Sequence, residues 1–266
     1  MMKQKLISLF VCFLCCLSCF EFVASASEDH VYHWYCVRNT EHKQPKMDET
    51  MSFVENYNGY YLDHQHGDDS EEKVVYLTFD AGYENGNIES ILNTMKEENV
   101  QGAFFILGNL ISKNPELICR MTEEGHLVCN HTVRHKNMTK IDDESAFAKE
   151  LQELESMYRS VTGKEMAKYY RPPEGTFDER SLKYASELGY RTIFWSLAYA
   201  DWDNDRQPDP QKAKELLLRY MHNGAVILLH PTSKTNAIIL KDFISTLKSQ
   251  GYRFGSLDEL CQVQKQ

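Results

Sequence analysis

KVVYLTFDAGYENG, residues 73–86, decides the fold, because in it a buried strand runs straight into an acidic residue. The apolar run from Val74 to Phe79 is nearly continuous, which is typical of a parallel strand with both faces buried. Asp80 follows this run directly. Apolar residues then recur at helical spacing over residues 88–95, so the stretch predicts a strand followed by a helix.

The alternation of strand and helix continues to residue 254. Further strands are predicted at 103–107, 126–130, 169–170, 192–196, 225–229 and 252–254. Further helices are predicted at 115–125, 147–163, 178–188, 210–222 and 238–247. This alternation is typical of an α/β protein with a parallel sheet and helices outside it. We therefore expect a (β/α) barrel of about seven units, closed or nearly closed, with a short N-terminal extension.

The chain divides into four segments of different character. We expect a leader at 1–26, an N-terminal extension at 27–72, a main domain at 73–255 and a C-terminal tail at 256–266. The extension is polar and aromatic without a clear period, so it is predicted to pack on the main domain. The formal net charge is −10. Proteins that bind nucleic acid usually carry a strong basic footprint, so the composition argues against a nucleic-acid partner.

The leader has the order of a secretory signal peptide. Lys3 and Lys5 precede an apolar run, and Ala24-Ser25-Ala26 matches a cleavage site. An uncleaved membrane anchor is the alternative, because the apolar run is long for a signal. Glu21, near the end of that run, disfavours a stable span. The sequence thus predicts an exported protein, anchored to the membrane only if the signal stays uncleaved.

The cysteines do not form a metal-binding pattern in the exported part of the chain. Four of the eight lie within the leader. The remaining four are Cys36, Cys119, Cys129 and Cys261. None of these forms a CxxC pair, so a structural zinc knuckle is not expected. Outside the cell they can form one or two disulfides, and the sequence leaves their pairing open.

Titratable or cationic side chains stand at the ends of five predicted strands. They are Asp80, His131, Arg171, Asp201 and His230. Active residues of β/α barrels gather at the carboxyl ends of the strands. One such residue is more often structural, but five in corresponding places indicate an active site.

His131 and His135 form a candidate metal site. They lie in His-Thr-Val-Arg-His, and if this segment is helical, both rings share one helix face within reach of one cation. Taken alone, two surface or capping histidines explain the pattern equally well. Asp80 at a neighbouring strand end makes the metal site the better interpretation.

Five short motifs resemble, in order and spacing, those of polysaccharide deacetylases of the NodB-homology group, also called carbohydrate esterase family 4. The motifs are Thr78-Phe79-Asp80-Ala81-Gly82, His131-Thr132-Val133-Arg134-His135, Arg171-Pro172-Pro173-Glu174-Gly175, Asp201-Trp202 and Leu229-His230. The resemblance covers residues 73–255. Residues 76–86, together with the His-, Trp- and Tyr-rich extension, resemble the subgroup that deacetylates muramic acid on the way to δ-lactam in spore-cortex peptidoglycan.

The resemblance implies roles for the residues at the strand ends. Asp80 would be the general base that takes a proton from water, and His230 the general acid that protonates the departing amine. Arg171 would keep Asp80 ionised, because an adjacent cation lowers a carboxylate pKa. Asp201 would support Arg171. Backbone N–H groups after Arg171 would help to stabilise the oxyanion.

The resemblance also implies a divalent metal, with Zn²⁺ the first expectation, held by His131 and His135. The commoner family members carry a second Asp as a third ligand, and Ala81 stands at that position here. Losing an anionic ligand weakens metal binding. Glu84 and Cys129 lie nearby in sequence, but a loop carboxylate and a small buried hydrophobe explain them better.

The expected substrate is peptidoglycan or a related N-acetylated glycan, contacted by Trp202, Pro173 and Leu229. Core packing is the alternative for Trp202. The expected location is extracellular, in the cell wall or the spore envelope. A deacetylase of chitin-like N-acetylglucosamine polymers is the second hypothesis. A non-catalytic glycan-binding pseudoenzyme, with Ala81 as its defect, is the third, although a binding module needs neither a base nor an acid.

Overall fold

The centre of the molecule is one parallel sheet of eight strands. The structure, a computed structural model, describes residues 30–262. The strands of the sheet are β4 (Gly59–Tyr60), β5 (Lys73–Ala81), β6 (Ala103–Ile106), β7 (Leu127–Asn130), β8 (Tyr169–Tyr170), β10 (Arg191–Ile193), β11 (Ala225–Leu229) and β12 (Tyr252–Phe254). Their order is β11-β5-β6-β7-β8-β10-β4, with β12 against β5. The predicted strands are thereby confirmed.

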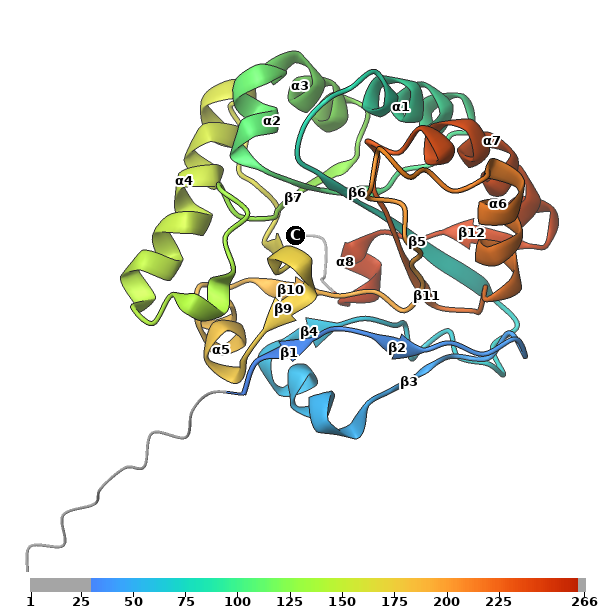
Figure 1. Cartoon of the computed structure of the whole chain (residues 1–266), viewed down its shortest axis with the longest axis horizontal. Helices are drawn as coiled ribbons and strands as arrows, with labels where there is room; N and C mark the ends of the chain where they lie inside the picture. Colours follow the sequence, from blue (N-terminus) through green and yellow to red (C-terminus); the bar gives the residue numbers. More distant parts are fainter. Residues whose placement is uncertain (1–29, 263–266) are drawn as a thin grey trace, which may run out of the picture.

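Helices surround most of this sheet (Figure 1). They are α1 (Asn87–Glu97), α2 (Gly108–Lys113), α3 (Pro115–Glu123), α4 (Glu144–Thr162), α5 (Glu179–Glu187), α6 (Pro210–Arg219), α7 (Lys234–Ser249) and α8 (Leu257–Leu260). Short α2 and α8 were not expected from the sequence. Within the segment expected to be a C-terminal tail, α8 buries Leu257 and Leu260 in the core.

Side-chain caps and glycines fix where the helices begin and end. Asp143 accepts a hydrogen bond from the N–H of Ala146 at the start of α4. Gly163 ends the same helix at φ 69°, a conformation that costs glycine little. At the start of α5, Asp178 and Ser181 form a capping box.

Strand β5 is buried on both faces, which explains its nearly continuous apolar sequence. Val75, Leu77 and Phe79 pack into the core between the sheet and the helices. Val74 and Tyr76 point the other way, into the interior of the barrel. Because side chains alternate along a strand, Asp80 lies on the interior face with Val74 and Tyr76. The polar end of β5 therefore opens into the barrel.

The barrel is incompletely closed. Where its edges meet, isolated bridges pair Leu197 with Ile227 and Leu62 with Ala225, in place of a continuous strand pairing. The N-terminal segment, residues 30–62, lies along the side that the helices leave uncovered (Figure 1). It contributes β1 (Tyr32–His33), β2 (Cys36–Val37), β3 (Lys46–Met47), the 3₁₀ helix η1 (Glu49–Tyr57) and β4. β4 extends the sheet beside β10, and β1 pairs with β9 (Thr176–Phe177).

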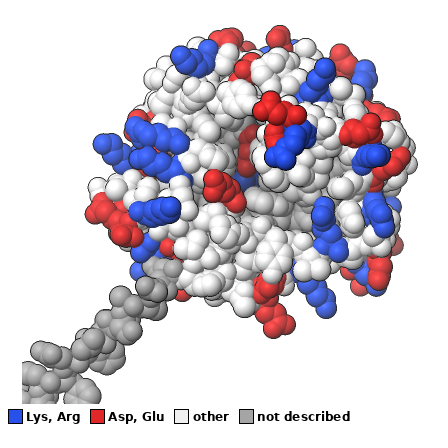
Figure 2. All heavy atoms as spheres, viewed as in Figure 1, with Lys and Arg blue, Asp and Glu red and all other residues white. Residues whose placement is uncertain are grey.

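Among residues 30–262, the cysteines at 36, 119, 129 and 261 are free thiols. No helix in this range has the length and hydropathy needed to cross a membrane. The predicted signal peptide lies outside the described residues. Acidic and basic side chains are interspersed on the face shown in Figure 2, without one continuous basic patch.

Candidate active site

The carboxyl ends of the strands bring the predicted residues together around Asp80. Arg171, which follows β8, donates from Nη1 to Asp80 Oδ1 at 2.8 Å. His131, which follows β7, places Nε2 3.6 Å from Asp80 Oδ2. His230, which follows β11, acts electrostatically on the same carboxylate. The prediction that these strand ends converge is therefore confirmed.

Arg171 is fully buried and held from several sides. Its Nε donates to the carbonyl of Ile193 at 2.8 Å, and its Nη2 donates to Thr78 Oγ1 at 3.0 Å. The guanidinium also lies 4.1 Å from the ring centre of Phe105. All three guanidinium nitrogens thus have a hydrogen-bond partner, and that of Nη1 is Asp80.

The charges around Asp80 keep it ionised. Burial alone raises its pKa, but Arg171, His131 and His230 outweigh that effect and hold the pKa below its ordinary range. The carboxylate side chain is 10% exposed. An ionised, nearly buried carboxylate at the mouth of the barrel is suited to accept a proton from a water molecule.

Asp201 pairs with His230, and this corrects the expectation that it supports Arg171. Asp201 Oδ1 lies 2.7 Å from His230 Nδ1, and Oδ2 accepts the His230 backbone N–H at 2.8 Å. Asn236, which the sequence did not single out, donates to Asp201 Oδ2 at 2.6 Å. The reason is geometric: the Arg171 donors are already bonded to Asp80, Thr78 and the Ile193 carbonyl.

The pKa of His230 is raised above its ordinary value. Burial lowers it, but the hydrogen bond and charge of Asp201, together with the charge of Asp80, outweigh that effect. Because Nδ1 faces the Asp201 carboxylate, it carries a proton and leaves Nε2 as the outward nitrogen. The Asp201–His230 pair is suited to deliver a proton from Nε2.

His131 and His135 approach each other through a turn, so the helix considered for this segment is wrong. Thr132 and His135 have φ of 72° and 54°, outside the helical range. Asn130 Oδ1 accepts the N–H of Thr132, and Thr132 Oγ1 accepts the N–H of His135. The two imidazole centres are nevertheless 5.0 Å apart. The predicted proximity of the rings holds, by a different local structure.

The two imidazoles fit a divalent metal as a sparse ligand set. His131 Nδ1 lies 2.8 Å from the Arg171 carbonyl, so it is the protonated nitrogen and Nε2 keeps its lone pair. Burial lowers the pKa of His131 to about 4, which keeps the ring neutral near pH 7. Within residues 30–262 no three His, Cys, Asp or Glu side chains form a metal-binding group.

The other considered ligands serve structural purposes. Glu84 accepts the backbone N–H of Gly86 beside the start of α1. Cys129 is fully buried in the barrel interior, where burial raises its pKa well above the ordinary value. Ala81 has a buried side chain that cannot coordinate. A further metal ligand would come from water, substrate or a carboxylate borrowed from elsewhere.

Two exposed aromatic side chains stand at the mouth of the site. Trp202 is 62% exposed, which excludes core packing, and its ring centre lies 6.2 Å from that of His230. Tyr83 is 46% exposed and accepts a hydrogen bond from Asn204, so it links the loop after β5 to the loop of Trp202. The sequence reasoning missed Tyr83, although it lies in the stretch of residues 73–86 that decides the fold.

Pro173 and Leu229, the other two residues expected to contact substrate, are buried. Leu229 is 1% exposed and packs in the core between the sheet and the helices. The expectation for its side chain is therefore wrong in this structure, because the alternation along β11 turns it away from the mouth. Trp202 is the one member of the predicted set that faces solvent.

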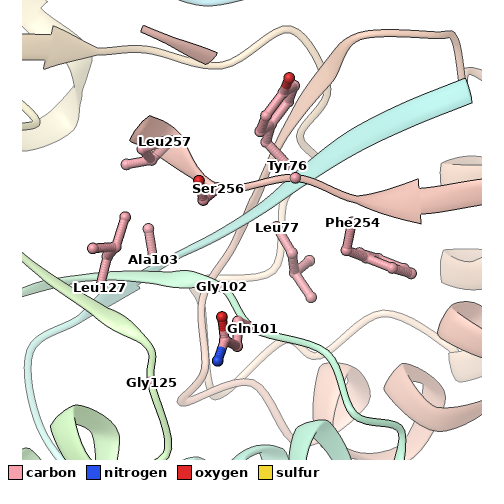
Figure 3. A pocket seen from close by; sticks show the side chains of 11 residues that line it. Tyr76, Leu77, Gln101, Gly102, Ala103, Gly125, Leu127, Phe254, Ser256 and Leu257 are labelled. Carbon is pink, nitrogen blue, oxygen red and sulfur yellow. The ribbon is translucent and has the colours of Figure 1, made fainter. Parts of the chain in front are cut away.

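A separate small cavity lies at the other end of the strands (Figure 3). Its volume is about 50 Å³, and Tyr76, Gly102, Leu127 and Ser256 are among the residues that line it. A water molecule occupies roughly 30 Å³ of liquid, so this space is too small for a sugar ring. The cavity is not a candidate substrate site.

Comparisons with known proteins agree with this geometry. Residues 67–193 match the family model described as Polysaccharide deacetylase. The chain is 37% identical to the peptidoglycan-N-acetylmuramic acid deacetylase PdaA of Bacillus subtilis, over 94% of this chain and 95% of that protein. The structure of Bacillus subtilis PdaA, a family 4 carbohydrate esterase, superposes with a TM-score of 0.81 at 38% identity, covering 86% of this chain and 96% of that one.

One similar structure is that of a pseudoenzyme, so similarity of fold does not by itself establish activity. A family 4 carbohydrate esterase pseudoenzyme from Bacillus anthracis superposes with a TM-score of 0.68 at 27% identity, covering 76% of this chain and 68% of that one. In the present chain, the base and acid candidates Asp80 and His230 are both in place with their partners. With 37% identity over nearly the whole length of a named deacetylase, the chain belongs to the polysaccharide deacetylases of carbohydrate esterase family 4.

Proposed function

We propose that this protein removes the N-acetyl group of muramic acid in peptidoglycan, on the way to muramic δ-lactam in the spore cortex. The observation that carries the activity is the pairing of Asp80 with Arg171 and of His230 with Asp201 at one end of the barrel. The choice of sugar rests on the similarity to PdaA, which spans the N-terminal segment as well as the barrel.

The reaction breaks the C–N bond of the acetamido group and adds water across it. Asp80, ionised by its neighbours, takes one proton as the water oxygen bonds to the acetyl carbon. His230, protonated through its pairing with Asp201, gives a proton to the amine nitrogen as the C–N bond breaks. Acetic acid and a free amino sugar leave, and the acid then loses its proton to solvent as acetate. Asp80 ends with one proton more and His230 with one fewer, so a proton exchange through solvent restores the pair.

The backbone after Arg171 offers one N–H for the oxyanion. Pro172 and Pro173 have no N–H. The N–H of Gly175 is already bonded to the carbonyl of Pro172 at 3.1 Å. Glu174 therefore supplies the first N–H after Arg171 that can turn to a substrate oxygen. Its φ of 59° is unusual for a non-glycine residue and sets the direction of that N–H.

Deacetylases of this family generally depend on a metal. His131 and His135 would hold it, and we propose Zn²⁺, because neutral imidazole nitrogens suit this ion. Such a metal, when bound, polarises the acetyl carbonyl and lowers the pKa of water. Asp80 and Arg171 keep their own roles whichever ion is present, since their contacts come from the chain itself.

We predict from the family resemblance that Ala81→Asp tightens metal binding by about 10-fold or more, because the commoner members carry an anionic ligand at this position. Ala81 packs in the apolar core, so the new carboxylate has to turn out of that core to reach the metal, and the folded state of the variant is checked first. Calorimetric titration with Zn²⁺ compares the native protein, Ala81→Asp and His131→Ala. His131→Ala should lose most of the affinity. If His131→Ala binds Zn²⁺ as tightly as the native protein, the proposed metal site is wrong. Activity of Ala81→Asp need not rise, because the new carboxylate can occupy the place of substrate or water.

We also propose that the protein is exported and acts in the cell wall or the spore envelope. The support is the order of Lys3, the apolar run and Ala24-Ser25-Ala26. N-terminal sequencing of secreted protein should find a first residue near position 27. A secreted or membrane-bound protein that begins at Met1 would show that the leader remains attached.

The function is tested by acetate release from two substrates. One is peptidoglycan glycan strands freed of their stem peptides, and the other is a chitin oligosaccharide. We expect release from the first and little from the second. Release from the chitin oligosaccharide alone would favour the N-acetylglucosamine hypothesis. Binding of either glycan without acetate release would favour the pseudoenzyme.

A further inference from the structure

Trp34 of the N-terminal segment binds two active-site segments, one through its backbone and the other through its indole ring. Its backbone N–H donates to the carbonyl of Gly175 at 2.9 Å. Its indole Nε1 donates to the carbonyl of Trp195 at 2.7 Å. The ring stacks on Phe194 with centres 4.2 Å apart and is 6% exposed. One residue thus links the loop that follows Arg171 to the end of β10.

The first linked element is the loop that carries the Glu174 N–H. Gly175 has φ 63°, and a Cβ there would lie 2.7 Å from the Trp195 ring and 3.3 Å from Trp34 Cβ. The loop is therefore pressed between the two tryptophans, with no room for a side chain. Immediately after the loop, β9 pairs with β1. Residues 32–34 therefore hydrogen-bond or pair with residues 175–177, where the chain leaves the loop.

The second linked element is the strand end that holds Arg171. The carbonyls of Ile193 and Phe194 accept hydrogen bonds from the guanidinium. Trp195 is the next residue, and its ring centre lies 5.7 Å from the guanidinium carbon. The indole of Trp34 therefore anchors the residue that directly follows two of the Arg171 acceptors.

We propose that Trp34 is a positioning residue for catalysis, which holds the Glu174 N–H and the Arg171 guanidinium in register with each other. The inference rests on the proposed function, since it assigns the roles of Glu174 and Arg171. Residues 30–62 then contribute to catalysis by holding catalytic groups of the barrel in position. An error of about 1 Å in the placement of catalytic groups can cost roughly 100-fold in rate.

The test is Trp34→Phe, which keeps an aromatic ring against Phe194 and removes the indole N–H. We expect kcat to fall about 10-fold, with KM, Zn²⁺ affinity and the shape of the pH profile close to native. The matched control is Tyr35→Phe, which removes the bond to Asp48 on the exposed side of the same segment. This control should keep native kcat.

Thr176→Val provides a second variant in case Trp34→Phe does not fold. Thr176 Oγ1 lies 3.0 Å from His33 Nδ1, so the change loosens the same junction without removing a ring. We expect a smaller fall in kcat at native KM. Native kcat in a folded Trp34→Phe, or in Thr176→Val if only that variant folds, would overturn the proposal. A rise in KM alone would also overturn it.

Failure of the proposal about Trp34 can be distinguished from failure of the proposed function. The native protein is first tested on peptide-free glycan strands and on a chitin oligosaccharide. If only the chitin oligosaccharide releases acetate, the choice of muramic acid fails, and the variants are compared on that substrate. If neither substrate releases acetate, the roles of Glu174 and Arg171 fail, and the inference about Trp34 falls with them.

Discussion

Asp80→Asn is expected to reduce acetate release by about 100-fold or more, the usual scale for loss of a general base. The amide keeps the shape of the carboxylate but cannot accept the water proton. It also leaves the buried Arg171 without its charged partner. Acetate release per mole of folded protein is the measurement.

Two controls make this result specific. Asp69→Asn changes an exposed carboxylate in the loop before β5 and should leave the rate unchanged. Zn²⁺ affinity is measured for Asp80→Asn as well, because His131 Nε2 lies 3.6 Å from Asp80. A rate near that of the native protein, from folded Asp80→Asn, would show that Asp80 is not the base.

His230→Ala is expected to cause a second loss of about 100-fold or more, because the amine would depart without a proton. The variant removes the imidazole that Asp201 holds, and leaves the Asp80–Arg171 pair intact. A substrate with a better leaving group should recover part of the lost rate. Native rates on the natural substrate would assign the acid to another group.

The pH profile should carry the signature of the same pair. Activity needs ionised Asp80, whose pKa is lowered, and protonated His230, whose pKa is raised. Activity should therefore decline as pH rises through the raised pKa of His230. On the acid side Asp80 stays ionised below its ordinary range, so protonation of the metal ligand His131, whose pKa is about 4, should set the limit. Asp201→Asn removes the carboxylate that raises this pKa, so the alkaline decline should move to lower pH. An unmoved alkaline decline would contradict the role of Asp201.

The strands could be predicted from the sequence because their signal is local. In β5, alternate side chains enter two different buried cores, so the sequence is apolar at nearly every position. The position of Asp80 at its end follows from the same pattern. The order of the strands then brings His131, Arg171 and His230 to the same edge, as the barrel rule predicts.

Partner choice could not be predicted in the same way. Asp201 lies several residues after β10, and only the folded loop shows that it meets His230 rather than Arg171. The turn at His131 depends on Asn130, whose amide is fixed by the distant Leu151 carbonyl and Tyr190 hydroxyl. Spacing along the chain contains neither of these contacts.

The N-terminal segment was the least predictable part that bears on the site. Its strands are two residues long, too short for a periodic signal. Trp34 reaches Trp195 across 161 residues of sequence. An aromatic-rich segment could be expected to pack on the barrel, but its connection to the Arg171 loop required the structure.

The most direct measurement is mass spectrometry of peptide-free peptidoglycan glycan strands before and after treatment with the native protein, with Asp80→Asn as the inactive control. We predict that muramic acid loses its acetyl group, that glucosamine keeps its own, and that Asp80→Asn leaves the strands unchanged. Loss of acetyl groups from glucosamine alone would contradict the proposed substrate. Strands that retain every acetyl group after treatment with the native protein would contradict the deacetylase activity itself.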